Sequence, residues 1–324
     1  MIYISKFKKD IWPLYVPPLP DELFSSWIYR LISNHRVNSD TFVKNYLHQK
    51  LFERNNDIDD FPKEEIIKTI KEHTPCKTEE LIELFLSSYN SSIIENNTPE
   101  EISKSIQFLK TKSFNNRRNS IVFCPGCLSK NTPYFRKKWR LTTSIVCVEC
   151  NSYLLDYCPG CNAQISYWNN KKSGEITSHI SHSIAICKCG YDLSNFFSPL
   201  SPTPTEMEYQ KYINSTIENG FNLHTQYSFT YLNTLLFIAY MLKKMIKSPR
   251  FKKRFDKMYP ELDITIDVPL YDWNVIQKRQ LLPIAYNLLE NFPKNIKEIF
   301  PKKHTVRKEF KQLPYWFEKE LLFR

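Results

Sequence analysis

FCPGC (residues 123–127), VCVEC (146–150), YCPGC (157–161) and CKC (187–189) place four cysteine pairs in one segment of the chain. Eight of the nine cysteines belong to these pairs, and only Cys76 lies outside them. A two-residue gap lets a tight turn point both sulfurs at one ion, and a structural Zn2+ ion takes four such ligands in a tetrahedron. Eight thiols therefore predict two four-thiolate sites in the middle of the chain.

Pairing in chain order assigns the ligands. The first site would be formed by Cys124, Cys127, Cys147 and Cys150, with nineteen residues between its two pairs. The second would be formed by Cys158, Cys161, Cys187 and Cys189, with twenty-five residues between its pairs. We expect each set to hold one structural Zn2+ ion on a small β zinc ribbon. Crossed pairing is an alternative, as is ligation of the second ion by His179 and His182.

Other uses of the cysteines fit the sequence less well. A disulfide framework is typical of short secreted chains, and no signal peptide opens this one. A hydrolytic enzyme with catalytic zinc is a third functional alternative. A catalytic zinc ion keeps one coordination position open, however, and four thiolate ligands leave none. Three of the five glycines, Gly126, Gly160 and Gly190, stand at the cysteine pairs, where we expect turns that need positive φ.

The charge is unevenly distributed along the 324 residues, which suggest two or three domains. The formal net charge is +11, and it arises from −2 over residues 1–115, +6 over 116–200 and +7 over 201–324. This asymmetry is typical of a face that binds a polyanion, most simply nucleic acid. A basic surface that serves solubility is the alternative. No apolar run reaches the roughly 18 residues of a membrane span, and reduced cysteines fit a cytoplasmic protein.

The sequence predicts a mainly α fold with small β zinc ribbons, in three domains. They are a helical partner-binding domain over 1–115, a tandem zinc-ribbon module over 116–197 and a basic helical domain, helix-turn-helix-like, over 198–324. Apolar spacing predicts a core helix over 23–32 and a buried helix face of Tyr231, Leu235, Ile238 and Leu242. Further helices are predicted at 40–50, 63–72, 79–88, from the capping box at 98–101, and at 273–282 and 284–291, around Pro283.

Basic runs mark the candidate DNA contacts. Residues 134–140 interleave aromatic and basic side chains, and on a ribbon strand the two kinds would point to opposite faces. Residues 243–257 hold eight basic residues and one acid, interrupted by Ser248-Pro249. A solvated helix or strand face is the alternative use of each run. The candidate DNA-binding residues are Arg117, Arg118, Arg136, Lys137, Lys138, Arg140, Lys252, Lys253 and Arg254.

Three phrases resemble the TniQ/TnsD family of transposon target-site selection proteins. LPDELFSSWIYRL (residues 19–31) is similar to the family's opening phrase, which precedes a helix. FCPGC with Tyr134-Phe135-Arg136 and Trp139-Arg140 is similar to the first zinc half-site and the strand after it, and Leu154-Leu155 before YCPGC is similar to the second. The family commonly has His where this chain has Cys150, and cysteine ligates zinc equally well.

The resemblance implies an adaptor without enzymatic activity in a bacterial transposition system. Such an adaptor recognises a DNA site or a CRISPR guide complex and recruits an AAA+ ATPase regulator. The sequence agrees, since it has no Gly-rich phosphate loop and its acidic run Asp57, Asp59 and Asp60 has the composition of a loop. The rival hypothesis is a zinc-scaffolded interaction subunit that docks, as a homodimer, on a CRISPR-type ribonucleoprotein complex without binding DNA. Neither hypothesis involves a membrane.

Overall fold

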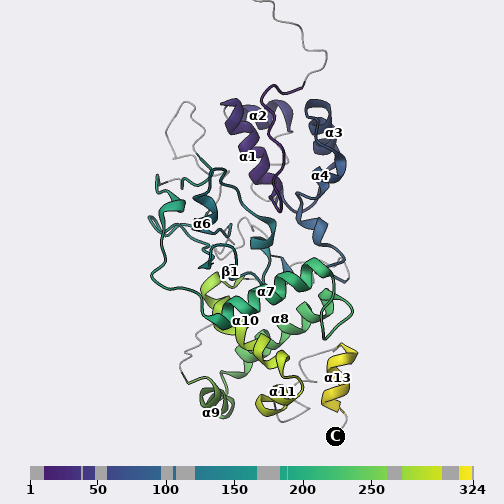
Figure 1. The fold of residues 1–324 in the computed structure, drawn as a ribbon, viewed down its shortest axis with the longest axis vertical. Coiled ribbons are helices and arrows are strands. Elements are labelled where there is room, and N and C mark those ends of the chain that lie inside the picture. The colour runs from purple at the N-terminus through teal and green to yellow at the C-terminus, as the bar shows by residue number, and fades with distance from the viewer. Residues whose placement is uncertain are drawn as a thin grey trace, which may run out of the picture. The chain divides into compact units, whose positions relative to one another are not determined.

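A computed structural model describes residues 11–37, 39–47, 57–95, 105–106, 121–165, 183–187, 189–260, 272–300 and 314–322. Within these ranges the protein is mainly helical, as predicted, and its regular sheet has two strands (Figure 1). The chain forms two compact units. The first unit comprises residues 1–88, 108–140 and 154–199, and the second unit comprises residues 89–107, 141–153 and 200–324. The predicted boundary between residues 115 and 116 and the capping box at 98–101 lie outside the described residues.

The core of the first unit is built on one amphipathic helix. In α1 (Phe24–His35) the apolar residues Phe24, Trp27, Ile28 and Leu31 recur every three or four positions and are fully buried, which confirms the predicted core helix. Phe24 stacks on Phe85 with 4.5 Å between ring centroids. The other short elements of this part of the chain are α2 (Ser39–Tyr46), α3 (Glu64–His73), α4 (Thr78–Ile82), η2 (Leu86–Tyr89), α6 (Pro125–Leu128), η3 (Lys137–Arg140) and η4 (Leu193–Asn195).

The helix predicted over residues 79–88 is confirmed only at its start, because two backbone N–H groups in its second half form hydrogen bonds outside the helix. α4 ends at Ile82, and η2 follows after a turn. The Leu86 N–H donates to the Asp59 carbonyl at 2.7 Å and the Ser87 N–H donates to the Asp60 carbonyl at 2.9 Å. These hydrogen bonds replace the i→i−4 bonds of a continuing helix, so the chain turns towards the loop that carries the aspartates.

The second unit combines one hairpin with a set of longer helices. Strands β1 (Val146–Cys147) and β2 (Ser152–Tyr153) pair antiparallel with Val146 opposite Tyr153. The face of Tyr231, Leu235, Ile238 and Leu242 is buried on α8, as predicted. None of the described helices is both long and apolar enough to cross a bilayer. The helices are α7 (Pro204–Asn219), α8 (Ser228–Met245), α9 (Pro249–Met258), α10 (Val275–Glu290), α11 (Lys294–Ile299) and α13 (Tyr315–Leu322) (Figure 1).

A single helix runs through Pro283, where two helices were predicted. α10 extends from Val275 to Glu290, and the side chains of Asn274 and Gln277 form a capping box at its start. Proline in a helix interior removes one hydrogen bond and costs about 3 kcal/mol. The residues on both sides of it are buried, including Leu282 and Leu288. Burying each such side chain stabilises the fold by about 1.5–3 kcal/mol, which offsets the cost of the proline, so the helix continues.

The hairpin is fixed to α7 by side-chain hydrogen bonds. The N–H groups of Ile145 and Val146 donate to Gln210 Oε1 at 2.8 and 3.3 Å. The Tyr153 hydroxyl donates to Glu206 Oε2 at 2.7 Å. The Tyr209 hydroxyl donates to the Thr143 carbonyl at 2.7 Å. Because these partners are buried, the turn between β1 and β2 is held in one orientation by the helical part of the second unit.

Candidate metal centres

The first cysteine group comprises Cys124, Cys127, Cys147 and Cys150. Their four sulfurs lie within 4.8 Å of one another. The first pair stands at the start of α6, where Cys124 Sγ accepts a hydrogen bond from the Cys127 N–H at 3.4 Å. The second pair brackets the turn between β1 and β2. Pro125 occupies the first helical position, so the tight turn predicted for this pair is a short helical turn.

The second cysteine group comprises Cys158, Cys161, Cys187 and Cys189, whose sulfurs also lie within 4.8 Å of one another. One pair lies in a turn closed by the bridge between residues 157 and 164, and the other in a turn closed by the bridge between residues 186 and 192. The Cys187 N–H donates to the Tyr191 carbonyl at 2.9 Å. Cys161 and Cys189 are exposed, so this group is more open to solvent than the first.

The sulfur separations fit a tetrahedral metal site. Cys158 Sγ lies 3.6 Å from Cys189 Sγ, and Cys161 Sγ lies 3.8 Å from Cys187 Sγ. A tetrahedron with metal–sulfur bonds of about 2.3 Å has an edge of about 3.8 Å. A disulfide would need about 2.05 Å, and all nine cysteines are free. Both groups have the ligand type and spacing to hold a metal ion, and they group as pairing in chain order predicts.

The surroundings of the second group act on its thiols in opposite directions. Burial raises the pKa of Cys187 to about 12 and also raises the pKa of Cys158. The Tyr191 backbone hydrogen bond lowers the pKa of Cys189 to about 7. A metal ion must therefore displace protons from the buried thiols, whereas the exposed Cys189 loses its proton more easily.

Of the three glycines beside the cysteines, one has the positive φ that was predicted and two do not. Only Gly190 has positive φ, at 88°, whereas Gly126 lies within α6 and Gly160 has no positive φ. Gly160 is required for space, because a Cβ atom there would lie 2.7 Å from the Tyr191 ring. Contacts under 3.0 Å force a rearrangement, so the two turns of the second group approach each other at Gly160.

We expect Gly160→Ala to disturb the second group alone. The added methyl group would push against Tyr191, whose backbone bonds to both Cys187 and Cys189, and would move that pair away from Cys158. The metal content of the purified variant, measured by mass spectrometry, should fall towards one ion per chain. A Gly160→Ala/Tyr191→Gly double variant, which removes both the ring and the Cβ atom that would obstruct the methyl group, should regain part of the lost metal. Full metal content in Gly160→Ala would contradict this account.

The basic run at residues 134–140 does not form the alternating strand that was predicted. Arg136 makes an isolated bridge, and η3 begins at Lys137. Arg136, Lys137 and Arg140 are buried, as is Trp139, whereas Lys138 is half-buried. A DNA contact by Arg140 would need an exposed guanidinium, and its side chain has no exposed surface. The candidate DNA residues Arg117 and Arg118, and the alternative ligands His179 and His182, lie outside the described residues.

Arg140 lies at the centre of an interior ion-pair network with Asp57, Asp59 and Ser25. Its Nη1 donates to Asp59 Oδ2 at 3.1 Å, and its Nη2 pairs with Asp57 Oδ2. Asp59 also accepts from the N–H and the hydroxyl of Ser25, each at 2.7 Å. Burial, followed by the charge of Asp57, raises the pKa of Asp59 to about 6, although Arg140 and Ser25 act in the opposite direction. Sequence reasoning missed this network, since the acidic run looked like a loop.

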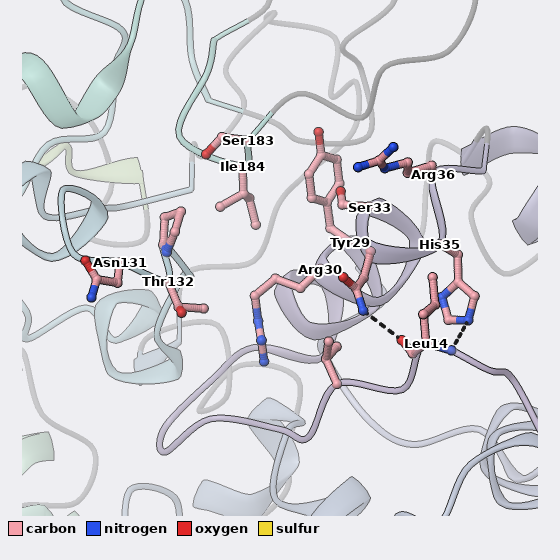
Figure 2. A pocket seen from close by; sticks show the side chains of 13 residues that line it. Leu14, Tyr29, Arg30, Ser33, His35, Arg36, Asn131, Thr132, Ser183 and Ile184 are labelled. Carbon is pink, nitrogen blue, oxygen red and sulfur yellow. Dashed lines mark hydrogen bonds between the residues drawn. The ribbon is translucent and has the colours of Figure 1, made fainter.

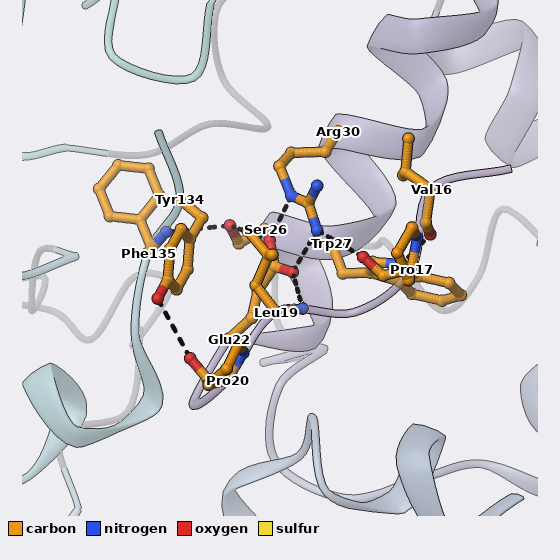
Figure 3. A network of polar contacts seen from close by, with 10 residues as sticks. All are labelled: Val16, Pro17, Leu19, Pro20, Glu22, Ser26, Trp27, Arg30, Tyr134 and Phe135. Carbon is orange, nitrogen blue, oxygen red and sulfur yellow. Dashed lines mark hydrogen bonds and ion pairs between the residues drawn. The ribbon is translucent and has the colours of Figure 1, made fainter. Parts of the chain in front are cut away.

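A second network joins the start of α1 to residues 134–137 (Figure 3). Arg30 donates from Nε to Glu22 Oε1 at 2.7 Å and from Nη2 to Glu22 Oε2 at 2.6 Å. Glu22 also accepts from the Ser26 hydroxyl, which in turn accepts from the Phe135 N–H at 3.0 Å. The Lys137 N–H donates to the Asp21 carbonyl at 2.7 Å. The segment of residues 19–31 and the basic run therefore pack against each other through these hydrogen bonds.

The remaining DNA candidates lie on the surface of the second unit. Lys252, Lys253 and Arg254 are exposed on α9, and Arg250 and Lys257 on the same helix are exposed as well. The buried residues of α9 are Phe251 and Phe255, so the helix packs without any of these five basic side chains.

Comparison with known proteins identifies part of the chain. Residues 13–154 match the family model described as TniQ. The match includes α1, the basic run and the first cysteine group, and it ends before the second cysteine group. A search of curated proteins gives no match to the chain.

Proposed function

We propose that this transposition-associated protein is a non-enzymatic DNA-targeting adaptor of a bacterial transposition system. The proposal rests on the TniQ domain that is formed by residues 13–154. TniQ domains are accessory domains in transposition and are not catalytic. In this proposal each cysteine group holds one structural Zn2+ ion, the basic helix α9 contacts DNA phosphates, and the first unit docks the AAA+ regulator or a guide complex. The observation that supports DNA binding most directly is the charge of α9.

α9 has a packed side and a charged side. Phe251 and Phe255 are buried four residues apart, and the Phe251 ring stacks on Phe300 with 5.7 Å between centroids. The outward side presents five exposed basic residues, and Asp256 is the only acid in the helix. Each basic residue that neutralises a phosphate releases a counterion, which makes binding strong and salt-dependent. The exposed basic residues are Arg250, Lys252, Lys253, Arg254 and Lys257.

A charge-reversal variant tests this placement of DNA. Lys252→Glu/Lys253→Glu/Arg254→Glu should weaken binding of duplex DNA strongly and lower the slope of log affinity against log salt by about 3, or about one per lost phosphate contact. Fluorescence anisotropy over a salt series measures both quantities. Because the side chains are exposed, the variant should keep its melting temperature.

A matched control removes the effect of net charge. Lys68, Lys71 and Lys77 are exposed in the first unit, and reversing all three to Glu changes the net charge by the same amount. This control should bind DNA nearly as the unchanged protein does. Equal loss in both variants would show that overall charge, and not α9, governs binding, and undiminished binding in the α9 variant would refute the proposed DNA face.

A second candidate function is the zinc-scaffolded interaction subunit that docks on a ribonucleoprotein complex without binding DNA. The observation that favours it is the burial of Arg136, Lys137 and Arg140, which leaves these three predicted DNA contacts little exposed surface. Co-purification with the guide complex that survives nuclease treatment, together with no salt-dependent DNA affinity, would favour this candidate over the first.

A further inference from the structure

The first unit contains an open groove of about 1190 Å³ beside the C-terminal half of α1 (Figure 2). Its other walls are an extended segment that includes Leu14 and Val16, the turn that ends at Pro133, and a short segment that includes Ile184. The volume exceeds the roughly 300–1,000 Å³ of clefts that enclose small molecules. The groove therefore has room for a segment of a polymer.

One wall of the groove is held in place by two neighbouring side chains of α1 (Figure 2). The Leu14 N–H donates to His35 Nε2 at 3.1 Å, and Asn34 Nδ2 donates to the Leu14 carbonyl at 3.0 Å. His35 Nδ1 lies 2.8 Å from the Leu31 carbonyl, so it carries the proton and donates. One ring nitrogen of His35 thus donates to α1 and the other accepts from Leu14. The groove is pre-formed, which lowers the entropic cost of binding.

Two arginines are among the described residues that line the groove, and they differ in whether a carboxylate pairs with them. Arg30 lines it, but its guanidinium is bonded to both oxygens of Glu22 and to the Pro17 carbonyl. Arg36 is exposed, and no carboxylate of the described residues pairs with its guanidinium. No acidic residue is among the described residues that line the groove. The walls also include hydroxyl and amide side chains, such as those of Asn131 and Thr132. A ligand with one negative charge, some apolar groups and the hydrogen-bonding groups of a peptide backbone would complement these walls.

The backbone of Arg36 supplies an independent observation. Arg36 ends α1 in the left-handed conformation, with φ of 53° and ψ of 33°. Glycine is the usual residue at this position of a helix, because a Cβ atom is strained there. Strained backbone conformations cluster at binding sites, where the side chain has a use. An arginine in this position therefore points to a function for its guanidinium.

We propose that the groove binds an extended peptide segment of a partner protein, in which a carboxylate lies beside apolar side chains. The carboxylate pairs with Arg36, and the apolar side chains contact Leu14, Val16 and Ile184. A nucleic acid strand fits less well, because the single cation at Arg36 can neutralise only one phosphate, whereas a strand that lies along the groove carries a phosphate at every nucleotide. This inference rests on the protein-docking part of the proposed function and is independent of its DNA-binding part.

An array of short synthetic peptides tests the proposal with the full chain. Peptides with mixed apolar residues are made in three forms: with a free C-terminal carboxylate, with a C-terminal amide and one internal Glu, and with a C-terminal amide and no acid. The unchanged protein should bind one of the acidic forms about tenfold better than the acid-free form, since a hydrogen-bonded charge pair is worth about that factor. The preferred form identifies the source of the carboxylate.

Arg36→Gly separates binding from folding. Glycine adopts the left-handed conformation freely, so the melting temperature should not fall, whereas the preference for acidic peptides should disappear. Arg36→Lys should keep part of that preference. Equal peptide binding by Arg36→Gly and the unchanged protein, or Arg36-dependent binding of single-stranded oligonucleotides in preference to peptides, would overturn the proposal.

The α9 charge-reversal variant distinguishes failure of this inference from failure of the proposed DNA role. It should lose DNA and keep the peptide preference, because its substitutions lie in the second unit and the groove lies in the first. Loss of the peptide preference in this variant would contradict a binding site at Arg36.

Discussion

Removal of the bound metal by a strong chelator should release two Zn2+ ions per chain, one from each cysteine group, and unfold the segments around them. Structural zinc contributes about 10–16 kcal/mol per ion in zinc-finger peptides, and that free energy becomes folding free energy for segments without a large core of their own. The regular sheet around these cysteines has only two residues per strand, so the hairpin has few backbone hydrogen bonds of its own and depends on the metal and on its contacts with α7. Circular dichroism and a chromogenic zinc indicator measure the two effects.

The order of release offers a sharper check. The second group should lose its ion first, because Cys161 and Cys189 are exposed whereas three of the four cysteines in the first group are buried. Cys161→Ser should lower the zinc content to one ion per chain. Cys76→Ser, which changes the one cysteine outside both groups, should keep both ions. An unchanged spectrum with no metal released would contradict the assignment of both sites.

Arg140→Met should reduce the free energy of unfolding by about 3–5 kcal/mol, because it leaves two carboxylates buried without their cation. Asp59 has no exposed side-chain surface, and the side chain of Asp57 is only 6% exposed. Both would face an apolar side chain of similar length. Chemical denaturation at fixed zinc concentration measures the change, and DNA affinity of the folded variant should stay the same.

Companion variants separate charge from packing. Arg140→Met/Asp57→Asn/Asp59→Asn removes both charges with the cation and should recover much of the lost stability, since replacing a whole buried ion-pair network by neutral groups is often nearly neutral. A loss below about 1 kcal/mol in Arg140→Met, combined with weaker DNA binding, would restore Arg140 to the DNA-binding set.

The cysteine groups were predictable because their information is local. Two sulfurs separated by one or two residues in a tight turn can reach one ion in almost any fold, so spacing indicated the members of each pair, and chain order indicated which pairs form one group. The core helix was predictable for the same reason, since the spacing of Trp27 and Leu31 reflects one buried face. These signals depend on neighbours within a few turns of the chain.

The basic run does not form the predicted strand, and its partners could not be predicted because they are distant in sequence. Arg140 meets Asp59 across 81 residues, and Lys137 donates to the Ser88 hydroxyl, at 2.6 Å, across 49 residues. A local pattern shows the cations but not the groups that neutralise them. The break predicted at Pro283 is wrong for a related reason. α10 continues through this proline because its side chains are buried against other helices, and a local sequence pattern does not show those contacts.

The attachment of the β1–β2 hairpin to α7 has a practical consequence for dissecting the protein. The proline-rich stretch after Ser198 looks like a natural place to cut, and a fragment that stops there keeps all eight paired cysteines. It would nevertheless lose Gln210 and Glu206, which receive hydrogen bonds from Ile145 and Tyr153. Truncation at this stretch should therefore give an aggregation-prone product with a misplaced Cys147–Cys150 turn, whereas co-expression of the two halves should restore it.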